Sequence, residues 1–107
     1  VNFNNQLPNM DWLTEEVNNA AIKKIIYLSH VSPYTSDFDP DLRYKFQQLI
    51  ENHPNSLLSI HGHTHNFDMK QAEESELVYL TAPTINKRKY VEVKIFGKST
   101  EITQKFY

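Results

Sequence analysis

The sequence contains no cysteine. Disulfide bonds and thiolate-bound zinc are therefore excluded, and a bound metal would need histidine, carboxylate, amide or water as ligands. The compartment stays open, because a cysteine-free chain suits the cytoplasm and the periplasm alike. We take a soluble, cytoplasmic protein as the working expectation.

Long apolar runs are absent too, and none approaches the about 20 residues that a membrane helix needs. No signal peptide is recognisable. The formal net charge is -2, so the overall charge does not favour binding to nucleic acid or to an anionic membrane. The basic cluster Lys87-Arg88-Lys89 is too short to change this expectation.

The length of 107 residues fits one domain, and we treat residues 1–107 as a single unit. The chain starts with Val1 rather than methionine, and residues 1–8 have the composition of a loop. We therefore expect it to be a fragment of a longer protein.

Apolar spacing predicts two helices, each followed by a short strand. The first helix is expected to begin at Trp12 after Asp11 as N-cap and to continue to about residue 23. Its strand, residues 25–29, is apolar throughout, which favours a strand covered on both faces. The second helix is expected to follow Asp39 as N-cap, with Pro40 in its first position.

The second helix should end at His53, before Pro54, and residues 56–60 form the next predicted strand. Beyond residue 66 the pattern becomes strand-like, with Gly97-Lys98-Ser99 as a hairpin turn. The strand-like segments are residues 67–70, 77–80, 90–96 and 101–106. The predicted fold class is α/β, with αβαβ followed by antiparallel strands.

Three of the five histidines alternate around a glycine directly after the second predicted strand, as His61-Gly62-His63-Thr64-His65. A fourth, His30, follows the first strand, and ligands in open α/β sheets gather at such strand ends. Gly62 predicts a sharp turn, which would aim His63 and His65 at different points. This arrangement suits two metal ions about 3.5–4 Å apart. The alternative is that these histidines cap a strand end or bond to the loop backbone.

These residues resemble a known family. Gly62-His63-Thr64-His65 after a strand is similar to the Gly-His-X-His motif of the calcineurin-like metallophosphoesterases. The segment Tyr27–Pro33 is similar to that family's upstream strand-end histidine motif, and Asp11–Val17 to the helix before it. The resemblance covers about residues 10 to 66, and the later antiparallel strands fit the family's second sheet.

The resemblance implies the C-terminal half of an α/β/β/α sandwich that hydrolyses phosphate esters through two divalent ions, Mn, Zn or Fe. His30 and His63 would bind one ion and His65 the other. His61 lies outside the motif and is interpreted as a structural or supporting residue. Tyr34, Asp37 and Phe38 in the loop after His30 are candidates for the substrate pocket; the alternative is ordinary loop and packing residues.

The same resemblance shows which motifs are missing. The family's acidic metal motifs and its Gly-Asn-His motif, which supply the remaining ligands and the catalytic histidine, belong to an N-terminal half that this sequence does not contain. We therefore expect the isolated chain to bind metal weakly and to be inactive, with that N-terminal half as its partner. An uncovered sheet face would also favour self-association.

Two other interpretations stay open. The first is a non-catalytic interaction module on the same fold, with vestigial histidines. The second is a self-contained zinc site made by His61, His63 and His65. The sequence does not distinguish monoester, diester, nucleotide or lipid-linked phosphate as the substrate.

Overall fold

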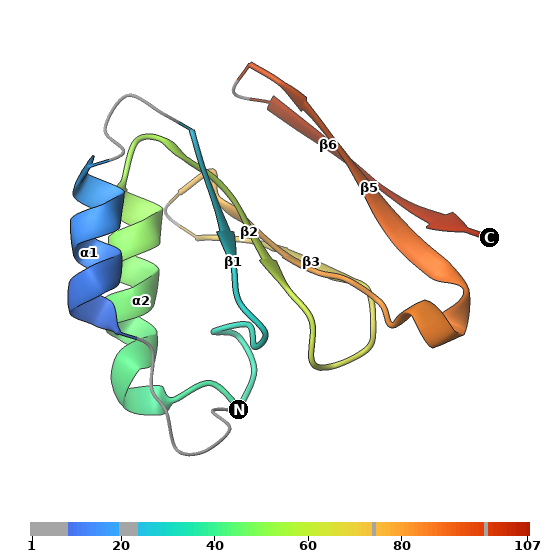
Figure 1. The fold of residues 1–107 in the computed structure, drawn as a ribbon, viewed down its shortest axis with the longest axis horizontal. Coiled ribbons are helices and arrows are strands. Elements are labelled where there is room, and N and C mark those ends of the chain that lie inside the picture. The colour runs from blue at the N-terminus through green and yellow to red at the C-terminus, as the bar shows by residue number, and fades with distance from the viewer. Residues whose placement is uncertain (1–8, 20–23, 74, 98) are drawn as a thin grey trace.

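The computed structural model describes residues 9–19, 24–73, 75–97 and 99–107. Its fold is α/β, as predicted. Figure 1 shows three layers: two helices, a four-stranded sheet and a separate two-stranded hairpin. The elements are α1 (Met10–Asn19), β1 (Ile25–Leu28), α2 (Pro40–Asn52), β2 (Ser56–His61), β3 (Asp68–Gln71), β4 (Val78–Thr81), η2 (Ile85–Lys87), β5 (Lys89–Phe96) and β6 (Ser99–Phe106). The expectations for residues 1–8 and for a helix end near residue 23 lie outside the described residues.

The start of α2 confirms the sequence prediction. The Asp39 side chain accepts a hydrogen bond from the Asp41 backbone N–H at 2.8 Å, and Pro40 occupies the first helical position. The helix ends at His53, whose extended backbone conformation suits the residue before proline. Phe46 and Ile50 form its buried face.

The predicted N-cap of α1 is wrong. The Asn9 side chain, not that of Asp11, accepts the hydrogen bond from the Trp12 backbone N–H, at 3.0 Å. Asp11 lies inside the first turn, where its negative charge is still favourable toward the helix dipole. Both residue types cap helices well, so local sequence alone did not separate them.

Replacement of the cap gives a direct test. We expect Asn9→Ala to lower the free energy of unfolding by about 1 kcal/mol, because it leaves the Trp12 N–H without its side-chain acceptor. Asp11→Ala should cost clearly less. Urea denaturation of both variants would measure the difference, and equal losses would contradict the assignment of the cap.

The main sheet has the strand order β1-β2-β4-β3. Strands β1, β2 and β4 are parallel, and β3 pairs antiparallel with β4. The expectation of only antiparallel strands after residue 66 is therefore wrong for β4, which continues the parallel part of the sheet. The carboxyl ends of β1, β2 and β4 consequently meet at one end of the sheet, the lower end in Figure 1.

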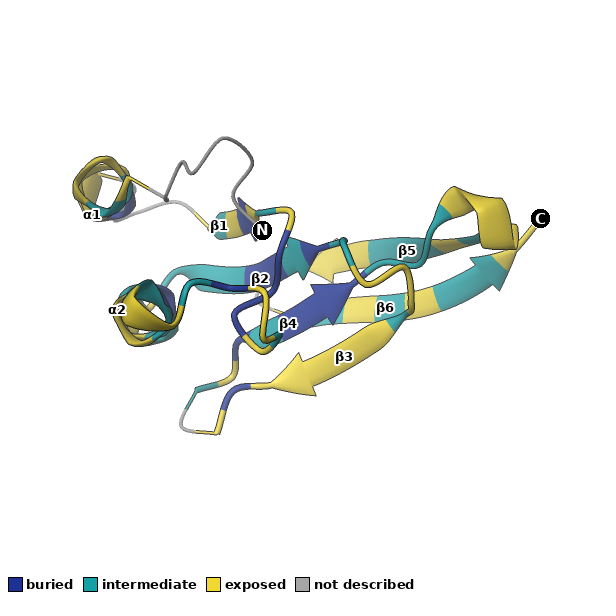
Figure 2. Ribbon diagram, turned by 90° about the horizontal axis from the view of Figure 1, so that it is seen from below, coloured by how far each residue is buried: buried dark blue, intermediate teal, exposed yellow. Residues whose placement is uncertain are grey.

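The core lies between the helices and one face of this sheet. Tyr27, Ser59 and Tyr79 are neighbours across β1, β2 and β4, and all three are buried. The helical side chains packed toward them include Val17, Phe46 and Ile50, the last fully buried. In Figure 2 the buried residues concentrate on β2 and β4, the central strands.

Strand β1 is not covered on both faces, contrary to the prediction. It is an edge strand, and its Ile26 and Leu28 are 40% and 77% exposed. The apolar run is therefore a poor guide to burial within this chain. This open edge is the surface on which the expectation of self-association rests.

The helices that the structure describes do not include one with the length and apolar character to cross a bilayer.

Candidate metal centre

The loops that follow the three parallel strands bring the predicted residues to one end of the sheet. His30 comes two residues after β1, and the turn with His63 and His65 follows β2. The Gly62 backbone N–H donates to the His30 carbonyl at 2.9 Å, which ties the two loops together. The pairing of β1 with β2 fixes this juxtaposition, since Leu28 lies opposite Ile60.

His30, His63 and Asp37 form a hydrogen-bonded chain. The His30 Nε2 atom lies 3.1 Å from His63 Nδ1, and the two rings meet edge to face. On its other side, His63 Nε2 lies 2.7 Å from Asp37 Oδ2. All three side chains remain accessible to solvent to some degree.

Hydrogen-bonding chemistry places one proton on His63. An ionised carboxylate only accepts, so the Nε2–H group of His63 donates to Asp37. In the tautomer that carries only this proton, Nδ1 has a lone pair and lies 3.1 Å from His30 Nε2. Nδ1 is then the atom through which His63 can bind a metal, with Asp37 holding the ring in the required tautomer.

The separation of His30 and His63 also suits a shared metal ion. Two nitrogens that each bind zinc at about 2.0–2.1 Å in tetrahedral geometry lie roughly 3.3 Å apart. The hydrogen-bonded nitrogens His30 Nε2 and His63 Nδ1 are 3.1 Å apart, close to that separation. Two protein ligands do not complete a zinc site, and among the described residues no group of three or more metal-ligating side chains converges on one point.

Gly62 does not make the turn that the sequence predicted. Its φ lies outside the left-handed region, whereas His63 and His65 have φ values of 70° and 66°. The Thr64 backbone N–H donates to the Gly62 carbonyl at 2.8 Å, which places His63 at the centre of a three-residue turn of the rare, strained form. Such backbone costs about 1–3 kcal/mol and concentrates at functional sites. The two histidines of the Gly-His-X-His segment are therefore the strained residues.

His65 is an exposed residue, and the ring contact between histidines among the described residues joins His30 to His63. The His65 carbonyl accepts a 3.3 Å hydrogen bond from the Thr84 N–H in the segment after β4. The assignment of His63 and His65 to different ions stays a prediction.

His61 has the structural environment predicted for it. Its ring is only 3% exposed, with Nδ1 2.7 Å from Ser29 Oγ and Nε2 2.8 Å from Ser59 Oγ. The Ser29 hydroxyl donates to the Val31 carbonyl, so His61 Nδ1–H donates to Ser29 and Nε2 accepts from Ser59. Both ring nitrogens are thus used inside the protein, and the alternative zinc site made by His61, His63 and His65 does not form in this structure.

Burial lowers the pKa of His61 from 6.5 to about 4, and hydrogen bonding with Ser29 offsets only part of that effect. His61 is therefore neutral at pH 7. Its ring stacks on Tyr79, with the centroids 6.0 Å apart. The Tyr79 hydroxyl donates to Glu51 Oε2 at 2.5 Å, and burial together with Glu51 raises the pKa of Tyr79 far above its ordinary range.

The three candidates for the substrate pocket have three different environments. Asp37 contacts His63. Tyr34 packs edge to face on Tyr79 at 4.9 Å, away from the histidine pair. Phe38 is 6% exposed and lies in the core, with its ring 5.3 Å from that of Phe46. Of the three, only Asp37 is placed beside the predicted metal ligands.

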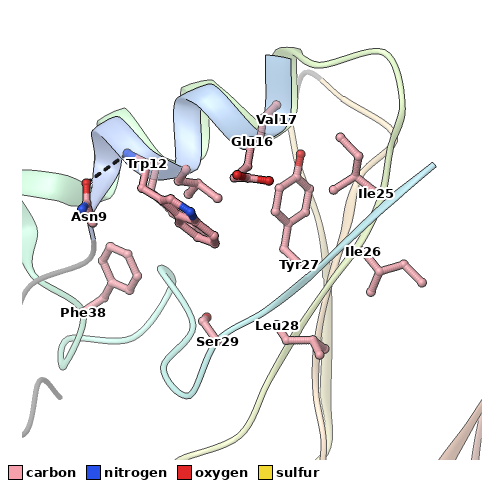
Figure 3. A pocket seen from close by; sticks show the side chains of 12 residues that line it. Asn9, Trp12, Glu16, Val17, Ile25, Ile26, Tyr27, Leu28, Ser29 and Phe38 are labelled. Atoms are coloured by element: carbon pink, nitrogen blue, oxygen red, sulfur yellow. Dashed lines mark hydrogen bonds between the residues drawn. The ribbon is translucent and has the colours of Figure 1, made fainter. Parts of the chain in front are cut away.

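An apolar groove runs along the open edge of β1 (Figure 3). It has a volume of about 470 Å³ and separates α1 from β1. The Trp12 ring is directed into it, and the groove ends at Ser29, the residue before His30. The lining of the groove includes Ser29 but not His30, His63 or Asp37.

Comparison with known proteins supports the α/β fold and no more. No protein-family model matches the sequence, and no curated protein does. Among solved structures, the solution NMR structure of the Thermotoga maritima protein TM1076 is similar, with a TM-score of 0.52 and 16% sequence identity. The match covers 78% of this chain and 48% of that protein, so the chain spans about half the length of its structural neighbour.

Proposed function

We propose that this chain is the C-terminal portion of a metal-dependent phosphoesterase and supplies histidine ligands to a two-metal centre. The observation that carries this proposal is the His30–His63–Asp37 chain, in which His30 Nε2 and His63 Nδ1 face each other at 3.1 Å and Asp37 holds the far side of the His63 ring. The motif resemblance of residues 62–65 and the strained backbone at His63 and His65 support it.

In this proposal His30 Nε2 and His63 Nδ1 hold one divalent ion, and His65 contributes to the second. Asp37 orients His63 rather than contacting substrate, because it bonds the ring nitrogen opposite the one that faces His30. The ions, Mn, Zn or Fe, would stabilise negative charge on the phosphoryl oxygens and activate the attacking water. The remaining ligands and the catalytic acid belong to a part of the protein outside this sequence.

The open edge of β1 supports the proposal that a further part of the protein packs against this strand. Leu28 is 77% exposed, and the neighbouring groove between α1 and β1 is lined mainly by apolar side chains. An N-terminal half that adds a strand beside β1 and fills this groove would cover that surface next to His30. In its absence the same surface favours self-association.

The alternative function is a non-catalytic interaction module. The exposed edge of β1 favours it, since an unpaired strand is itself a surface for a partner. In that case the histidine turn would keep its geometry without binding metal.

Metal titration of the metal-free chain tests the proposed site. We expect Zn²⁺ or Mn²⁺ to shift or broaden the imidazole NMR signals of His30 and His63 together. His53 should respond far less, because its Nδ1 accepts from the Asn55 N–H at a helix end. Unchanged His30 and His63 signals would contradict the proposal.

Asp37 provides a sharper test of the geometry. Asp37→Ala removes the acceptor that holds the His63 tautomer, so we expect metal affinity to fall about 10- to 100-fold. Ser36→Ala, in the exposed neighbouring position of the same loop, is the matched control and should leave affinity unchanged. Equal metal affinities for the two variants would show that Asp37 does not contribute to the metal site.

A further inference from the structure

A basic segment adjoins the histidine turn. The connection from β4 to β5 bonds to that turn twice through its backbone: Ala82 N–H donates to the His61 carbonyl at 2.9 Å, and Thr84 N–H to the His65 carbonyl at 3.3 Å. Lys87 adds a side-chain bond, from its ammonium to Asn66 Oδ1. The basic segment Lys87-Arg88-Lys89 is thereby fixed at the same end of the sheet as the histidines, as Figure 1 shows for η2 and the loop after β2.

Within the part of the chain that the structure describes, the three basic residues of this segment form no ion pair. The ion pairs there join Asp37 to His63, and Glu92 to Lys94 and Lys105. Lys89 is directed elsewhere, with its ammonium 5.4 Å from the centre of the Phe106 ring. Lys87 and Arg88 are exposed and supply the positive charge beside the turn.

The backbone of the segment is held in place. Arg88 has a φ of 55°, its N–H donates to the Ile85 carbonyl, and its carbonyl accepts from the Tyr107 N–H at 3.0 Å. The Tyr107 hydroxyl also donates to the Ile85 carbonyl, at 2.9 Å. These bonds from Tyr107 fix the backbone of the turn from which the Lys87 and Arg88 side chains extend.

We infer that Lys87 and Arg88 bind a second phosphoryl group, next to the one hydrolysed at the histidine centre. This inference rests on the proposed function for the position of the first group. Asn66 directly follows His65 and accepts from Lys87, so an anion extended from the histidine turn meets the Lys87 ammonium first. Ammonium and guanidinium groups bind phosphoryl oxygens through charge-assisted hydrogen bonds. The substrate class is therefore a phosphate ester that carries a diphosphate linkage, rather than a simple monoester.

The test uses the metal-free chain in a chelator, with inorganic pyrophosphate and orthophosphate as probes. At low salt we expect pyrophosphate to bind at least about fivefold more tightly than orthophosphate. It should also perturb the backbone NMR signals of residues 85–89. The double variant Lys87→Gln/Arg88→Gln should weaken pyrophosphate binding by about tenfold.

Lys45→Gln is the matched control, because Lys45 is an exposed lysine on α2, on the opposite side of the molecule from η2. It should leave pyrophosphate binding unchanged. Equal binding of the two anions, or equal loss in the double variant and in Lys45→Gln, would overturn the inference. Since no metal is present, this result is separate from the metal titration of His30 and His63, and either proposal can fail without the other.

Discussion

Acidification from pH 6.5 to about 4 is expected to lower the free energy of unfolding of this chain by about 3 kcal/mol through His61 alone. The folded state holds the pKa of this imidazole at about 4 rather than 6.5. Each unit of difference corresponds to about 1.4 kcal/mol. The effect is large because a domain of this size has only about 5–15 kcal/mol of total stability.

The sign follows from where the proton binds. Below pH 6.5 the unfolded chain protonates His61 while the folded chain does not, so protons favour unfolding. The contribution is therefore fully present above pH 6.5, decreases as the pH falls, and is lost at about pH 4. The physical cause is burial: an imidazolium between Ser29 and Ser59 would lose hydration and would present a second N–H to a hydroxyl that now donates.

Urea denaturation between pH 7.5 and 4 measures this dependence. His61→Asn is the informative variant, because its amide can donate to one serine and accept from the other without titrating. We expect the variant to be less stable at pH 7.5 but to lose less stability on acidification than the wild-type chain. The difference between the two slopes isolates His61 from the carboxylates, and identical slopes would refute its role.

The bounds of α2 could be predicted from the sequence because local signals specify them. Asp39-Pro40 and His53-Pro54 carry steric and capping constraints that operate within a few residues, and α2 begins and ends where they indicate. Asn9 and Asp11 offered competing caps of similar strength, and the structure uses Asn9. The parallel pairing of β4 with β2 was missed because strand direction depends on non-local contacts.

The sequence predicted the juxtaposition of His30 and His63, but not the different environments of Tyr34, Asp37 and Phe38. Spacing and strand ends place His30 and His63 together, since β1 and β2 are parallel neighbours. The role of Asp37 could not be predicted, because it depends on how the loop after His30 folds back on His63. The positive φ values at His63 and His65 could not be predicted either, because glycine was the residue expected to adopt such a conformation.

Under the proposed function, His63→Ala or His65→Ala in a longer protein that carries the remaining ligands is expected to lower phosphoesterase activity by more than about 100-fold. Removal of an outer residue that only orients a ligand already costs about 10- to 100-fold, so removal of a ligand should cost more. The two variants should lose activity for different reasons. His63→Ala empties the position beside His30, whereas His65→Ala removes the ligand proposed for the second ion.

Hydrolysis of an aryl phosphate with added Mn²⁺ or Zn²⁺ measures the activity, and His53→Ala is the control that should retain it, because that histidine sits at the end of α2. Alanine adopts left-handed backbone less readily than histidine, so the stability of each variant is measured by urea denaturation beside its activity. A loss of activity without a loss of stability therefore assigns these residues to the chemistry. Full activity in both variants would refute the metal-ligand assignment, and a folded wild-type protein that neither binds metal nor hydrolyses the ester would favour the interaction module instead.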